Sequence, residues 1–199
     1  MVYNQGIFHP VTLETQAIPR PFARILQIFT AILLFLGSAE VYGNDLIDSA
    51  KSGNAARVGE LIERGAIVDA TDQEGMTSLW IAAAEGHGDV IRQLISAKAD
   101  VNAATRNGAT ALWMASAAGH GDIVRQLIAA QADVNVTTRN GATALWIASA
   151  EGHTGVVRLL IDAKADVNTV THNGVSILFV ASAAGRSDIV KLLKEAGAK

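Results

Sequence analysis

The sequence runs Asn107-Gly-Ala-Thr-Ala-Leu-Trp113 and repeats the same phrase as Asn140-Gly-Ala-Thr-Ala-Leu-Trp146. Variants of the phrase stand on either side, as Glu74-Gly-Met-Thr-Ser-Leu-Trp80 and Asn173-Gly-Val-Ser-Ile-Leu-Phe179. The aromatic residues that close the four phrases are spaced 33 residues apart. A fixed period of this length predicts a chain of stacked structural repeats, in which each unit packs on its neighbours.

Each repeat carries the signals of two helices. Thr110, three residues before Trp113, is a good N-cap for a first helix, and Gly119 suits the left-handed residue that ends it. Apolar residues then recur at helical spacing in Asp122-Ile-Val-Arg-Gln-Leu-Ile128, which predicts a second, antiparallel helix. Asn107-Gly108 favours a two-residue turn with positive backbone dihedrals. The predicted fold is an all-α repeat solenoid, with stacked antiparallel helix pairs joined by hairpin-like β-turn fingers.

The units resemble ankyrin repeats, whose usual phrases are Gly-x-Thr-Pro-Leu-His, Gly-His and Gly-Ala-Asp-Val-Asn. Matching phrases here include Gly119-His120 and Ala132-Asp-Val-Asn135. The resemblance implies an ankyrin-type solenoid that binds other proteins. The chain departs from the family at the His that ends the phrase Gly-x-Thr-Pro-Leu-His. At this position the four repeats have Trp80, Trp113, Trp146 and Phe179. We expect these four rings to form a structural ladder packed in the core, in place of the hydrogen bonds that the family's His makes between repeats. The alternative is an exposed aromatic platform for a ligand.

The composition changes near residue 44, because all three prolines and most aromatic residues precede it. Residues 1–43 are interpreted as an N-terminal leader. Its uncharged segment 25–37 is too short as a helix for a membrane core of ~30 Å, so it predicts a signal peptide, with an uncleaved anchor or a buried structural helix as alternatives. Both membrane interpretations export the remaining chain, to the periplasm or outside the cell. That remainder is an ankyrin-like repeat domain over 44–199, which divides into an N-terminal capping half-repeat over 44–72 and full repeats over 73–105, 106–138, 139–171 and 172–199.

The composition also excludes several kinds of chemistry. The chain has no Cys, and its net charge of -3 is atypical of a nucleic-acid binder. It contains no nucleophile elbow, phosphate loop or dinucleotide fingerprint, so we predict no enzyme, no catalytic residue, no cofactor and no small-molecule substrate. His87, His120 and His153 recur one repeat apart, too far for one ion to bind all three at ~2.1 Å, so no metal site is expected. The resemblance implies that these histidines serve local hydrogen bonds in the turn between helices.

Residues that vary between repeats predict the binding surface, since stacking fixes the others. The resemblance places this surface at the finger tips and on the concave side of the first helices. The predicted partner-binding residues are Gln73, Glu74, Glu85, Arg106, Asn107, Arg139, Asn140, Glu151, His172 and Asn173. Arg106 and Arg139 form a basic pair ~10 Å apart, continued by His172, beside a floor that is mostly alanine. Arginine forks suit carboxylates, so we expect a protein partner that docks an acidic strip against the tips.

Three further interpretations stay open at this level. An inhibitor or immunity-type protein would use the same surface to cap an enzyme. A small-molecule or metal binder would use the aromatic ladder and the histidines. A cytosolic adaptor is the outcome if the leader is not an export signal. Contact with a membrane is expected only through the N-terminal segment.

Overall fold

The computed structural model describes residues 42–199, and these belong to one compact unit. The predicted leader, apart from its last two residues, lies outside the described residues. Residues 42–51 are helical. The helices that follow are α2 (Ala55–Glu63), α3 (Ser78–Glu85), α4 (Gly88–Ser96), α5 (Ala111–Ala118), α6 (Gly121–Ala129), α7 (Ala144–Glu151), α8 (Thr154–Asp162), α9 (Ile177–Ala183) and α10 (Ser187–Glu195).

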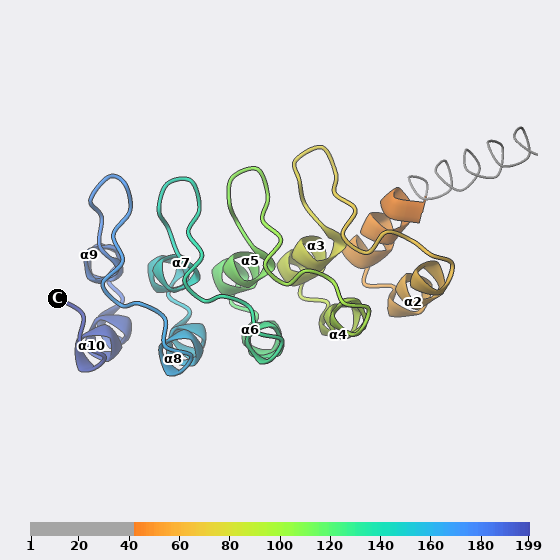
Figure 1. Ribbon diagram of the computed structural model, residues 1–199. Coiled ribbons are helices and arrows are strands. Elements are labelled where there is room, and N and C mark those ends of the chain that lie inside the picture. Colours follow the sequence, from red (N-terminus) through yellow and green to blue (C-terminus); the bar gives the residue numbers. More distant parts are fainter. Residues whose placement is uncertain (1–41) are drawn as a thin grey trace, which may run out of the picture. The chain divides into compact units, whose positions relative to one another are not determined.

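The helices form two parallel rows (Figure 1). Helices α3, α5, α7 and α9 make the inner row, and α4, α6, α8 and α10 make the outer row. A finger projects before each inner helix, and isolated bridges such as Ala104 with Thr110 close the base of three fingers. No longer strand occurs among residues 42–199. The predicted all-α solenoid of stacked helix pairs joined by fingers is therefore confirmed.

The ends of the inner helices follow from the predicted capping residues. Thr110 Oγ1 accepts a hydrogen bond of 3.2 Å from the backbone N–H of Trp113, and the other three repeats use Thr or Ser in the same way. Gly119 ends α5 with a φ of 76°, in the left-handed region that favours glycine. The helix signals in the sequence thus act as expected.

The finger turn differs from the predicted two-residue turn. Gly108 has a positive φ of 81°, but Asn107 does not. The backbone N–H of Thr105 donates to Ala109 O at 3.0 Å, and that of Gly108 donates to Thr105 O at 2.8 Å. The connection is therefore a three-residue loop that ends in a left-handed glycine. It needs only one residue with positive φ, and glycine adopts that conformation at a lower free energy than asparagine does.

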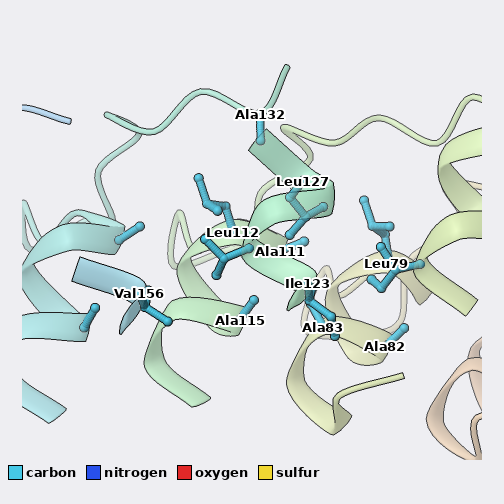
Figure 2. Packing of buried hydrophobic residues seen from close by; sticks show 14 of the residues in the cluster. Leu79, Ala82, Ala83, Ala111, Leu112, Ala115, Ile123, Leu127, Ala132 and Val156 are labelled. Carbon is cyan, nitrogen blue, oxygen red and sulfur yellow. The ribbon is translucent and has the colours of Figure 1, made fainter. Parts of the chain in front are cut away.

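The core lies between the two rows and runs through all repeats. Each full repeat buries a large aliphatic residue from its inner helix and another from its outer helix, such as Leu112 from α5 and Leu127 from α6. Figure 2 shows these two side chains together with Leu79 of α3. Burying one leucine fully stabilises the fold by about 1.5–3 kcal/mol. The rows are therefore held together mainly by repeated apolar packing.

Candidate functional site

Consecutive finger tips are joined through their backbones. The N–H of Arg106 donates to Glu74 O at 3.2 Å, and the N–H of Arg139 donates to Asn107 O at 2.9 Å. In the same way, the N–H of His172 donates to Asn140 O of the previous finger at 2.9 Å. These hydrogen bonds occupy main-chain groups along the row of finger tips, called the finger edge below. A partner at this edge must therefore be recognised mainly by the side chains of the tips.

The tip side chains predicted to bind a partner are exposed and lie on consecutive fingers. They are Gln73, Glu74, Arg106, Asn107, Arg139, Asn140, His172 and Asn173. Glu85 and Glu151 are also exposed, but they are the last residues of α3 and α7. An inner helix of this length spans ~12 Å, so the structure separates these two carboxylates from the tips.

The arginines of the tips differ from Arg92 and Arg125 of the outer helices, although Arg158 of α8 also forms no ion pair among the described residues. Arg92 and Arg125 form ion pairs with Asp89 and Asp122 on their own helices. Arg106 and Arg139 make no ion pair with any acidic residue in the described part of the chain. The finger edge thus carries exposed positive charge that residues 42–199 do not neutralise.

A groove of about 560 Å³ lies beside this edge. It is lined by Glu74, Met76, Trp80, Thr105, Asn107, Ala109, Trp113, Thr138, Arg139 and Asn140. The lining comes from the first three fingers and from two inner helices, α3 and α5. Its size is within the range of sites that hold small molecules or single large side chains.

The aromatic residues do not form the fully buried ladder that the sequence predicted. Trp80, Trp113 and Trp146 are half-buried, and Phe179 is 64% exposed. The finger of the next repeat contacts Trp146, whose Nε1 donates to Val175 O at 3.2 Å. No finger follows Phe179 within the described residues. The prediction of a core ladder is therefore wrong for Phe179 and overstates the burial of the tryptophans.

The histidines of the Gly-His phrases connect repeats. Nε2 of His87 lies 3.0 Å from Lys51 O, and Nε2 of His153 lies 2.9 Å from Ala117 O. His120 makes the corresponding contact, at 3.2 Å. The expectation of bonds within the local turn needs correction, because each ring donates to the preceding repeat. These histidine rings therefore link consecutive repeats by hydrogen bonds, in addition to the contact that Trp146 makes with the next repeat.

The same rings explain why the helix-ending glycines have no side chain. A Cβ on Gly119 would lie 2.6 Å from His153 Nδ1, closer than real Cβ contacts allow. No group of three His, Asp or Glu side chains that could hold a metal ion occurs within residues 42–199. The three histidines are thus structural links that lie in separate repeats.

The recurring acidic residues also belong to the scaffold. Asp133 Oδ1 accepts from the N–H of Asn135 at 2.9 Å, which shapes the turn after the outer helix. Asn102 Oδ1 accepts from the N–H of Asp133 at 2.8 Å, which ties one repeat to the next. Asp133 thus shapes the turn within its own repeat, and Asn102 links that turn to the preceding repeat.

Sequence analysis missed part of the groove lining. Met76 and Ala109 occupy equivalent places, directly before the N-cap threonine of an inner helix, and the fourth repeat has Val175 there. The sequence carries a signal, because this position is Met, Ala or Val while its neighbours are always Gly before it and Thr or Ser after it. The predicted surface covers only residues that directly precede a finger glycine or a helix-ending glycine.

Comparison with known proteins identifies the repeats. A family model described as ankyrin repeats, three copies, matches residues 46–138 and 117–199. No curated protein shows significant similarity to the chain. Within residues 42–199, no helix has the length and apolar character needed to cross a membrane. Ankyrin repeats generally mediate protein–protein interaction, and the family is typically non-enzymatic. Because the matches together span residues 46–199, more than half of the sequence, the chain belongs to the ankyrin repeat family.

Proposed function

We propose that this chain is an exported, non-enzymatic module that holds a protein partner through its finger tips and the concave face of its inner helices. One observation carries the proposal. Arg106 and Arg139 are exposed on neighbouring fingers and have no acidic partner among the described residues, whereas Arg92 and Arg125 are paired. A row of unpaired cations beside a groove favours a ligand that brings its own carboxylates.

The chemistry of the edge defines the partner. Equivalent residues of neighbouring repeats are ~10 Å apart, so the two guanidinium groups fit carboxylates spaced by about three residues of an extended segment. Attraction between exposed charges weakens over a Debye length of ~8 Å at physiological salt. We therefore expect the association rate to fall as salt concentration rises.

The chain contains a matched pair of controls for this proposal. The double variant R106A/R139A removes the unpaired arginines, and R92A/R125A removes two arginines at the same spacing on the outer helices. Partners cross-linked to the full chain in its native compartment are identified and purified, and their affinity for each variant is measured by calorimetry at two salt concentrations. We expect R106A/R139A to bind tenfold or more weakly and R92A/R125A to bind normally. Equal binding by both variants contradicts the proposal.

The proposal that the chain is exported depends on the leader predicted over residues 1–43. Arg20 and Arg24 precede the apolar segment 25–37, and acidic residues follow it, which is the arrangement that leaves the N-terminus inside and carries the remainder across a membrane. Cell fractionation and N-terminal sequencing of the mature chain test this. A product beginning after Ala39 or Gly43 outside the cytoplasm supports a cleaved signal, and an intact membrane-bound chain supports an anchor. An intact chain in the cytoplasm contradicts export.

A further inference from the structure

We infer that the groove over Trp80 and Trp113 receives one large apolar side chain from an extended segment of the partner, and that a carboxylate about three residues away on this segment pairs with Arg139. This inference rests on the proposed function and specifies the sequence that the partner presents.

The groove is built for an apolar side chain. Its volume is about 560 Å³, and two half-buried indole rings and Ala109 contribute to its walls. A bound aromatic side chain would bury on the order of 150–250 Å², at about 25 cal/mol per Å² of apolar area. The exposed residues Glu74, Asn107 and Arg139 also line it. The site therefore combines an apolar interior with polar groups at its margin.

The first two tryptophans differ from the third. Trp146 Nε1 donates to Val175 O, and the Trp146 ring packs against the core. The buried Nε1 atoms of Trp80 and Trp113 have no hydrogen-bond partner among residues 42–199, and both tryptophans line the groove. Val175 of the fourth repeat stands where the second repeat has Ala109 and the third repeat has Ala142. The larger valine accompanies a closed site, and the alanine accompanies an open one.

The polar rim favours an acidic residue on the partner. Arg139 makes no ion pair among the described residues. Asn140 is already engaged, because Thr138 Oγ1 donates to its Oδ1. The backbone groups of the tips are joined to one another, so the partner cannot extend them as an added strand. Charge complementarity at Arg139 and side-chain burial between the indoles are the contacts that remain.

The spacing of the two contacts follows from the repeat. The apolar side chain sits over Trp80 and Trp113, and Arg139 belongs to the finger of the repeat after Trp113, about one repeat or ~10 Å further along the stack. An extended segment advances ~3.3 Å per residue, so three residues separate the apolar side chain from the carboxylate. The expected motif is a Phe, Trp, Leu or Met with an Asp or Glu three or four positions away.

The test uses the full chain and a phage library of random ten-residue peptides. We expect selected peptides to share the motif, and we expect their Kd to rise tenfold or more for A109V and for R139A. A109V narrows the groove with a residue that the fourth repeat already holds at this place, so it preserves the fold; circular dichroism and the unfolding midpoint check this. V175A is the matched control, because Val175 lies outside the groove lining, and it should not weaken peptide binding.

Tryptophan fluorescence places the bound peptide. In variants that keep one tryptophan and have Phe at the other two positions, a selected peptide without Trp should change the emission of Trp80 and Trp113 and leave that of Trp146 unchanged. Selection of peptides without the motif, or binding that A109V and R139A do not weaken, overturns the inference. If the native partner still requires Arg106 and Arg139 but binds A109V normally, the groove inference fails while the proposed function stands.

Discussion

Three residues at the ends of the outer helices are held in an unfavourable backbone conformation, and their replacement by glycine should stabilise the protein. Lys98, Gln131 and Lys164 have φ values of 66°, 67° and 67°, in the left-handed region. Gly65 and Gly197 occupy the equivalent places in the first and last units, with φ of 85° and 94°. The three central repeats therefore keep a side chain where the backbone favours glycine.

The geometry at these places is that of a helix end closed by a left-handed residue. In the first case the N–H of Lys98 donates to Ile95 O at 3.0 Å, and the N–H of Ala99 donates to Leu94 O at 3.0 Å. Lys98, Gln131 and Lys164 are all exposed, and no side-chain hydrogen bond or ion pair involves them among the described residues. Removing these side chains should therefore leave the folded contacts intact.

The expected gain can be worked out for one site. A non-glycine residue in the left-handed region costs roughly 1–2 kcal/mol. Glycine offsets part of this because it loses about 0.5–1 kcal/mol more backbone entropy on folding. The difference leaves a gain of about 0.8 kcal/mol at each site. The sites lie in separate repeats, so their effects should add, to about 2.4 kcal/mol for the triple variant K98G/Q131G/K164G.

The assay is urea unfolding of the full chain, followed by circular dichroism and tryptophan fluorescence. The triple variant should raise the urea midpoint without changing the m-value, and its Tm should rise by about 5–10 °C. A97G is the control, because Ala97 caps the same helix with a φ of −79° and glycine there relieves no strain. It should lose about 0.5–1 kcal/mol. A triple variant no more stable than the unchanged protein, or an A97G variant that gains stability equally, refutes the reasoning.

Three other predictions concern stability. S78A should gain about 1 kcal/mol in urea unfolding, because the buried Ser78 hydroxyl has no hydrogen-bond partner and the next two repeats hold alanine at its place; a loss of stability contradicts this. H120A should lose about 1–2 kcal/mol because its ring bonds to the preceding repeat, whereas H172A, at an exposed tip, should change stability by less than about 0.5 kcal/mol; equal losses would contradict the assignment. The Arg57 guanidinium donates to Glu60 and lowers the pKa of this carboxyl below its usual 4.5, so its stabilising contribution is present above that value and is lost as the pH falls through the lower folded pKa. Titration of Glu60 by NMR should show the lowered pKa, and R57A should return it towards 4.5.

The fold could be predicted from the sequence because its signals are local and recur in each repeat. Thr110 and Gly119 mark the two ends of a helix by their own backbone chemistry, and the stacked neighbours impose the same choice in every unit. The finger turn was less well predicted, because Asn-Gly is compatible with several loop lengths. Only the hydrogen bonds of Thr105 show which loop forms.

The candidate site could be predicted in part. The tip residues follow from the repeat register, so Arg106 and Arg139 were found directly. The groove could not be predicted in this way, because it depends on how far the next finger covers each indole ring. The extent of this cover depends on finger residues such as Ala109 and Val175. In the sequence these look like ordinary small apolar residues. The roles of the histidines were also missed, since their partners lie 36 residues earlier in the chain.

The comparison of Trp113 with Trp146 shows how one scaffold position can serve two purposes. Both rings follow the same capping threonine at the same place on an inner helix, so the fold fixes where each ring begins. What differs is the next finger, which bonds to Trp146 through Val175 O and leaves Trp113 beside the groove. Repetition therefore supplies a row of aromatic side chains, of which Trp146 packs against the core under its covering finger while Trp80 and Trp113 line the groove.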